Sequence, residues 1–127
     1  MNLLDASAIF NLFQSGEYSV LIAGATIPLA RYEIGNILWK NNKIRNRISK
    51  REAIESGSVL FELIDSMEQV VPSPDSVLRL SLEEGLTFYD SSYLISAIES
   101  GYDFITDDVK LYNIAVTKVP TRKSSDL

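Results

Sequence analysis

Residues 2–13 read Asn-Leu-Leu-Asp-Ala-Ser-Ala-Ile-Phe-Asn-Leu-Phe. The short apolar start at 2–4 predicts a strand, and the apolar spacing after Asp5 predicts a helix. The same order of strand, Asp and helix returns near the end of the chain, where Phe104-Ile105-Thr106 precedes Asp108 and a helix over 108–115. A strand that leads into a helix is the unit from which parallel sheets are built.

The rest of the chain continues this alternation. Further strands are predicted at 25–27, 69–71 and 116–119, and further helices at 18–23, 29–40, 49–66, 74–84 and 90–100. Right-handed crossovers between such strands give a five-stranded parallel sheet with helices on both faces, a three-layer α/β/α sandwich. The 127 residues fit one domain, 1–127, with a polar tail at 120–127 that we expect to be loose.

The composition excludes several kinds of chemistry. The chain has no cysteine and no histidine, so disulfides, zinc–thiolate sites, cysteine nucleophiles and histidine general bases are absent. Its net charge of −5 argues against generic binding to nucleic acid, although a bound metal would reverse the local sign. No apolar stretch is long enough to cross a membrane, and the N-terminus lacks a secretory signal, so we expect a cytoplasmic protein.

Two acids follow predicted strands. Asp5 and Asp108 therefore fall at the carboxyl edge of the sheet, where ligands bind in such folds. Each also precedes a helix, and Asp is a preferred helix N-cap. Capping and ligand binding explain these two positions equally well.

Two other acids lie on apolar helix faces. Glu33 projects into an arc formed by Leu29, Ala30, Ile34, Ile37 and Leu38. A carboxylate facing a core requires a cation or a salt bridge, and Arg31 lies on the other side of this helix. Asp90 lies on the apolar side of its helix in the first turn, where capping is the alternative.

Converging carboxylates repel one another and raise their own pKa values. A hard divalent cation removes this repulsion, and Mg²⁺ or Mn²⁺ needs only oxygen ligands. Such a site can activate water and neutralise charge on a phosphoryl group. The sequence therefore predicts a site for Mg²⁺ or Mn²⁺ that cuts a phosphodiester.

Four segments, in this order, resemble the motifs of PIN-domain nucleases, most of all the small VapC-type toxins of toxin–antitoxin pairs. They are Leu3-Leu4-Asp5-Ala6-Ser7-Ala8, Tyr32-Glu33-Ile34-Gly35-Asn36, Leu86-Thr87-Phe88-Tyr89-Asp90-Ser91-Ser92-Tyr93 and Phe104-Ile105-Thr106-Asp107-Asp108. The resemblance covers essentially the whole chain. It implies a five-stranded parallel sheet and a metal-dependent endoribonuclease that leaves a 5′-phosphate and a 3′-hydroxyl.

The resemblance also implies roles for single residues and for partners. By position, Asp5, Glu33, Asp90 and Asp108 match the acidic catalytic and metal-binding residues. Thr106 matches an accessory hydroxyl, Ser7 and Asn36 match supporting polar positions, and Asp107 falls at a variable place. An RNA substrate, a cognate antitoxin and a homodimer are further expectations from the family.

Six of the twelve basic residues lie between Lys40 and Arg51. We expect Lys43, Arg45 and Arg47 to contact RNA phosphates, with a solvated helix end as the alternative. Two rival functions remain at this stage. A phospho-acceptor signalling domain would need paired acids after the first strand, and a non-catalytic RNA- or protein-binding member would not need intact acids.

Overall fold

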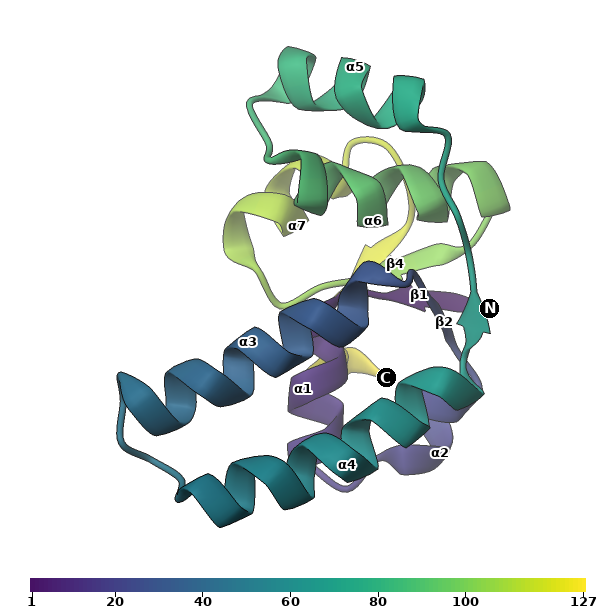
Figure 1. Ribbon diagram of the computed structural model, residues 1–127. Helices are drawn as coiled ribbons and strands as arrows, with labels where there is room; N and C mark the ends of the chain where they lie inside the picture. Colours follow the sequence, from purple (N-terminus) through teal and green to yellow (C-terminus); the bar gives the residue numbers. More distant parts are fainter.

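A five-stranded, all-parallel sheet forms the centre of the computed structural model, which describes residues 1–127 (Figure 1). The strands are β1 (Asn2–Leu4), β2 (Ala25–Thr26), β3 (Glu68–Gln69), β4 (Asp103–Ile105) and β5 (Thr121–Arg122), in the spatial order β3-β2-β1-β4-β5. Helices cover both faces of this sheet. The predicted three-layer α/β architecture is confirmed.

The helices divide by order along the chain. One face carries α1 (Ala6–Gln14), α2 (Tyr18–Ile22), α3 (Leu29–Lys43) and α4 (Lys50–Ser66), which contact one another. The other carries α5 (Pro74–Glu84), α6 (Phe88–Ser100) and α7 (Val109–Ala115), at the top of Figure 1. None of these helices combines the length and the apolar character that a membrane-spanning segment requires.

The side of the sheet on which the chain adds new strands changes between β1 and β4. These central strands pair residue by residue, with Leu3 opposite Phe104 and Leu4 opposite Ile105, and all four side chains are fully buried. From this pair the chain builds β2 and β3 on one side and β5 on the other. Ligands bind beyond the carboxyl ends of strands at such a reversal, which is where the residues after Leu4 and Ile105 lie.

Several predicted helix ends are confirmed. Ser49 and Glu52 form a reciprocal capping box at the start of α4. Gly85 and Gly101 end α5 and α6 with φ of 69° and 70°, a left-handed conformation that glycine adopts without a steric penalty. The helix α3 continues to Lys43, beyond the expected end at residue 40.

The prediction of a fifth strand at 116–119 is wrong, because those residues form the turn after α7. The strand is instead Thr121–Arg122, bonded to β4 through Phe104 N–H to Pro120 O at 2.8 Å and Thr106 N–H to Arg122 O at 3.1 Å. A short 3₁₀ helix, Ser124–Asp126, then contacts α1. The segment after Pro120, expected to be loose, is thus part of the sheet and its cover.

The third strand also begins earlier than predicted, at Glu68. Both displaced strands lie at the edges of the sheet. An edge strand pairs on one side only and needs no continuous apolar run. Apolar content is therefore a poor guide to where these two strands lie.

Candidate active site

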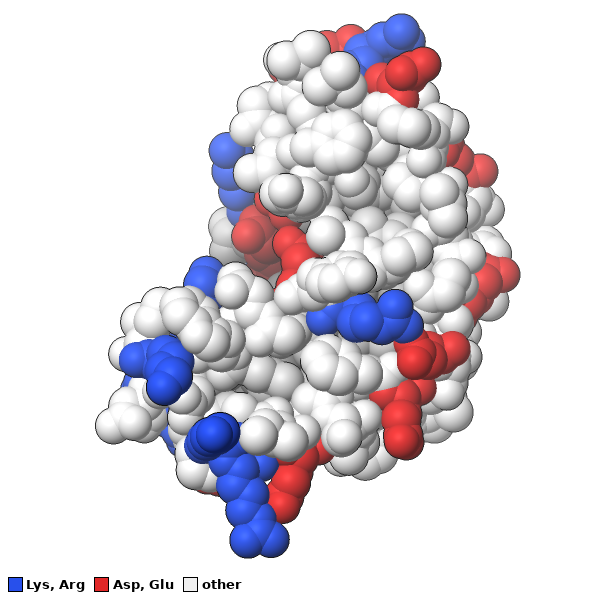
Figure 2. Space-filling model, in the orientation of Figure 1, with Lys and Arg blue, Asp and Glu red and all other residues white.

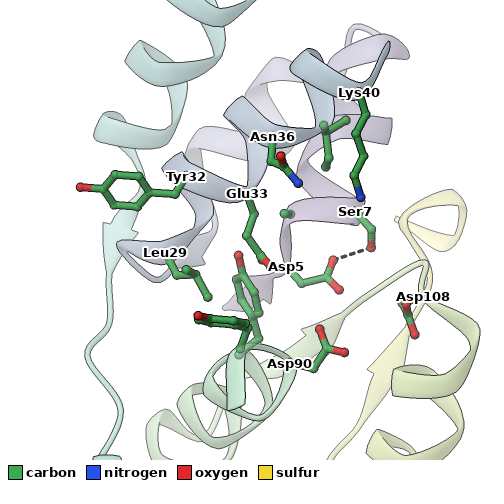
Figure 3. A pocket seen from close by; sticks show the side chains of 13 residues that line it. Asp5, Ser7, Leu29, Tyr32, Glu33, Asn36, Lys40, Asp90 and Asp108 are labelled. Carbon is green, nitrogen blue, oxygen red and sulfur yellow. Dashed lines mark hydrogen bonds between the residues drawn. The ribbon is translucent and has the colours of Figure 1, made fainter. Parts of the chain in front are cut away.

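The four predicted acids line one cavity of about 440 Å³ at the carboxyl edge of the sheet. Figure 3 shows Asp5 after β1, Glu33 on α3, Asp90 on α6 and Asp108 before α7, arranged around this space. In Figure 2 acidic atoms gather in the hollow between the two helical layers. Four segments that are distant in sequence therefore supply carboxylates to one place.

Asp5 is held most tightly. Its side chain is 5% exposed and accepts hydrogen bonds from Ser7 Oγ at 2.6 Å, Ala8 N–H at 2.9 Å and Thr106 Oγ1 at 2.5 Å. Burial raises its pKa from 3.8 to about 6, and these three bonds oppose the rise. The bond from Ala8 also makes Asp5 the N-cap of α1, so the capping explanation is confirmed, and the same side chain lines the cavity.

Thr106 connects Asp5 to Asp108. Its hydroxyl donates to Asp5 and accepts from the Asp108 N–H at 3.1 Å. Asp108 in turn accepts from Leu111 N–H at 2.8 Å and caps α7. Thr106 and Ser7, which the resemblance matches to accessory and supporting positions, thus bond directly to the Asp5 carboxylate.

The internal salt bridge considered for Glu33 does not form. The chain has four ion pairs and Glu33 is in none of them, while Arg31 on the same helix pairs with Asp65. Burial raises the pKa of Glu33, the Tyr93 hydroxyl opposes the rise, and Asp90 adds to it. An unpaired carboxylate facing a cavity is what a cation site requires.

Tyr93 lines the cavity as well, although the sequence predicted no role for it at the site. It is 1% exposed, and its hydroxyl is buried without a hydrogen-bond partner. That hydroxyl interacts with Glu33, but the pair lacks the geometry of a formed hydrogen bond. The spacing of Asp90 and Tyr93, three residues apart on one helix face, was the available signal.

The capping alternative for Asp90 is wrong, because α6 begins two residues earlier than expected. Thr87 is the N-cap, and its hydroxyl accepts from the Asp90 N–H at 3.0 Å. The Asp90 carboxylate is left to face the cavity. Burial and then Asp108 raise its pKa, while Thr87 and Lys110 oppose the rise.

The donor chemistry of this cavity suits a hard divalent cation, because its four acidic side chains all offer carboxylate oxygens. Repulsion among them contributes to the raised pKa values of Glu33 and Asp90, which a cation would reverse. No three acids lie close enough to hold one ion together. Mg²⁺ often takes only one or two protein carboxylates and keeps several waters, so water would supply the remaining ligands.

Other polar groups complete the wall. Asn36 lines the cavity as expected, and Lys40 lies one turn further along α3. Lys40 had been grouped with the basic stretch, although its spacing from Glu33 and Asn36 places all three on one helix face. Tyr32 and Tyr89 also line the cavity and are exposed.

Asp107 faces away from this cavity. Its carboxylate accepts from Asn11 Nδ2 at 2.7 Å, and from the Ser124 N–H and hydroxyl at 2.8 and 2.5 Å. Burial would raise its pKa, but the bonds from Ser124 and Asn11 bring it below the ordinary value. Through these bonds Asp107 holds Ser124 and the C-terminal segment beside α1.

The basic residues predicted to form one patch lie in two places. Arg45 and Arg47 line a second hollow beside α1, which also shares Ser7 with the acidic cavity. Lys43 lines a separate groove between α3 and α4. The structure thus divides the three residues that sequence reasoning had grouped.

The chain is similar to proteins of known type. Exonuclease VapC9 of Pyrobaculum aerophilum is 36% identical over 121 residues, covering 91% of this chain and 85% of the relative. Ribonuclease VapC3 of the same organism is 32% identical over 120 residues, covering 85% of this chain and 89% of the relative. A scan against protein-family models gave no match.

Solved structures agree with these relatives. The crystal structure of PAE2754 from Pyrobaculum aerophilum matches with a TM-score of 0.81 and 30% identity, over 98% of this chain and 91% of that one. VapBC-1 from nontypeable Haemophilus influenzae shares the fold, with a TM-score of 0.59 and 12% identity over 98% of each chain. With its fold and sequence relatives in agreement, this chain belongs to the VapC-type PIN-domain nucleases.

Proposed function

We propose that this nuclease is a metal-dependent endoribonuclease and the toxin of a toxin–antitoxin pair. The observation that supports it best is the convergence of Asp5, Glu33, Asp90 and Asp108 on one cavity, where no ion pair neutralises them. Relatives bear the names ribonuclease and exonuclease, and from these we take RNA as the substrate class.

In this proposal Asp5, Glu33 and Asp90 hold Mg²⁺ or Mn²⁺, directly or through water. When bound, the cation offsets negative charge on the phosphate and favours deprotonation of water. Asp108 orients the attacking water. The water oxygen bonds to phosphorus and the bond from phosphorus to the 3′ oxygen breaks, which leaves a 5′-phosphate and a 3′-hydroxyl.

The surrounding residues prepare these carboxylates. Ser7 and Thr106 fix Asp5 in one orientation, and the Thr106 hydroxyl also fixes the backbone that carries Asp108. Thr87 positions the first turn of α6 and so the Asp90 side chain. A site whose ligands are held before the substrate arrives loses little free energy to reorganisation.

The test is cleavage of one RNA sequence in linear and in circular form, with Mn²⁺ or Mg²⁺ and with a chelator. Only an endonuclease cuts the circle. We expect cleavage of both forms by the wild type with metal, and none by Asp5→Asn or Glu33→Gln. Glu62→Gln, which changes an exposed acid on α4 outside the cavity, is the matched control.

Each outcome has a separate meaning. Cleavage of the linear form alone would make the protein an exonuclease, the activity named for one relative. Cleavage that persists in chelator would refute the metal requirement. Failure of the wild type to cut any RNA would refute the ribonuclease and favour the non-catalytic binding member.

The partners are also part of the proposal. We expect the chain to form a homodimer and to be inhibited by a cognate antitoxin, as the family resemblance implies. Growth arrest on expression that Asp5→Asn abolishes would support the toxin role, and light scattering would test the dimer. The phospho-acceptor alternative is disfavoured, because such domains order their strands 2-1-3-4-5 and this sheet is ordered β3-β2-β1-β4-β5.

A further inference from the structure

A second hollow, of about 500 Å³, adjoins the acidic cavity, and Ser7 and Ile37 line both. We call it the arginine hollow, after Arg45 and Arg47 in its wall. We infer that it binds the nucleotide next to the scissile phosphate of a single-stranded RNA. This inference rests on the proposed ribonuclease function and adds the path that the substrate takes.

The loop that carries the two arginines is fixed by its own hydrogen bonds. The Arg45 N–H donates to Lys40 O at 2.9 Å and the Arg47 N–H donates to Asn41 O at 2.8 Å. Asn42 Nδ2 donates to Ile48 O at 2.9 Å and closes the loop. The arginines therefore start from a backbone that is already positioned.

The residue between the arginines has an unusual conformation. Asn46 has φ of 51° and is the only residue other than glycine with a positive φ in the chain. Asn tolerates this left-handed conformation better than most residues. The turn that it makes brings Arg45 and Arg47 to the same hollow.

Both guanidinium groups are available to an anion. Neither takes part in any of the four ion pairs, and both residues are exposed. Arg45 makes a single side-chain bond, to Asn41 Oδ1 at 3.3 Å. Arginine binds phosphate through paired N–H groups, so two unpaired arginines beside a phosphodiester-cutting site fit the next phosphate of the strand.

The remaining walls suit a nucleoside. Asn11, Gln14 and Asn41 line the hollow with carboxamides, and Phe10 and Ile48 contribute apolar surface. Asn11 Nδ2 already donates to Asp107 and Asn41 Oδ1 already accepts from Arg45, so the Asn11 oxygen, the Asn41 nitrogen and the Gln14 amide are the groups left for a base edge. The arginines alone would serve an acidic protein segment as well as a phosphate, but the amide and apolar groups beside them add contacts that a base can use. An unpaired base from a single strand can enter this hollow, whereas a base inside a duplex cannot.

Lys43 supplies an internal comparison. It lies only two residues before Arg45, but it lines the groove of α3 and α4 with Trp39 and Ile54. Figure 2 shows how Lys and Arg side chains spread around the end of α3 and α4 that the connecting loop joins. If charge alone attracted RNA, removing Lys43 would matter as much as removing Arg45 or Arg47.

The experiment measures binding of a short single-stranded RNA to protein carrying Asp5→Asn, so that cleavage does not interfere. In this background a double variant, Arg45→Ala and Arg47→Ala, is compared with the single variant Lys43→Ala. Binding is measured by fluorescence anisotropy over a range of salt concentrations. The double variant should weaken binding at least about tenfold. Its salt slope should fall by about 0.7, because the two arginines hold one phosphate and each phosphate contact on a single strand contributes about 0.7. Lys43→Ala should match its parent.

Two further measurements keep the outcomes distinct. With active protein, the double variant should raise KM for RNA while leaving cleavage of a small activated phosphodiester unchanged, since that substrate does not reach the arginine hollow. Arg45→Lys with Arg47→Lys keeps the charge and should recover part of the affinity, even if the alanine variant folds poorly.

Three results would overturn the inference. The first is an equal loss of RNA affinity in Lys43→Ala and in the double alanine variant of Arg45 and Arg47. The second is an unchanged KM for RNA in the double variant. The third is a loss of affinity for poly-glutamate in the double variant as large as its loss for RNA, which would indicate an acidic protein partner. Failure of the ribonuclease proposal would look different, because wild-type protein would then cut neither RNA nor the small diester.

Discussion

Replacing Asp5 with Asn should stabilise the protein at neutral pH without divalent cations, although it removes a residue of the proposed active site. The Asp5 carboxylate has a pKa of about 6 in the folded protein, against an ordinary value of 3.8. At about 1.4 kcal/mol for each pKa unit, this corresponds to about 3 kcal/mol. That is the cost of keeping the carboxylate ionised in its buried position.

The sign of the pH dependence follows from proton binding. Folded Asp5 holds its proton more tightly than the unfolded chain does, so its contribution lowers the free energy of unfolding as the pH rises from about 4 to about 6. Above about pH 6 the full cost is present. The Asn variant carries no charge and lacks this dependence.

The variant has a cost of its own. Asn can still accept the bonds from Ser7 and Ala8, but its amide replaces the oxygen that accepts from Thr106. We allow about 1 kcal/mol for that exchange. The variant should therefore be about 2 kcal/mol more stable than wild type at about pH 7.5 and slightly less stable at about pH 4.

Urea denaturation in chelator at several pH values would measure this difference, with Glu62→Gln as an exposed control. The curves of wild type and Asp5→Asn should cross between about pH 4 and pH 6. A variant that is less stable than wild type at every pH would refute the reasoning, because burial would then impose no cost on the charge. Adding Mg²⁺ should stabilise wild type but not the variant, which reports metal binding without any cleavage assay.

Three further substitutions, two beside the acidic cavity and one against β1, can be tested by urea denaturation. Thr106→Val should cost about 1–3 kcal/mol, because it leaves Asp5 without its third donor, whereas Thr106→Ser should stay near wild type. Tyr93→Phe should leave stability unchanged or raise it by about 1 kcal/mol, because the buried hydroxyl has no partner; a clear loss would mean that it is bonded to Glu33. Gly24→Ala should cost about 1–3 kcal/mol, since the new Cβ would lie 2.7 Å from a leucine side chain and 3.2 Å from a backbone oxygen of β1. Gly35→Ala, with its nearest neighbour at 3.8 Å, should be tolerated.

The alternation of strands and helices predicted the parallel sheet, and sequence periodicity predicted the apolar faces of the helices that carry Glu33 and Asp90. Glu33 is an example: it was placed on the apolar face of its helix, and that face lines the cavity. Periodicity depends only on local geometry, which is the same in every helix. It therefore transfers directly from sequence to structure.

Features that depend on pairing or on loops could not be predicted in this way. The strand β5 is polar and short, and it is defined by its bonds to β4 rather than by its own residues. The separation of Lys43 from Arg45 and Arg47 depends on where α3 ends and on the left-handed turn at Asn46. Neither leaves a periodic signal in the sequence.

The bond between Thr106 and Asp5 joins residues 101 positions apart. Asp5 directly follows β1 and Thr106 directly follows β4, and these two strands pair at the centre of the sheet. Asp5 therefore keeps this contact only while β1 and β4 are paired. Any partial unfolding that separates these two strands takes a hydrogen bond from the acidic cavity at the same time as it opens the centre of the sheet. The site and the core of this protein are thus lost together.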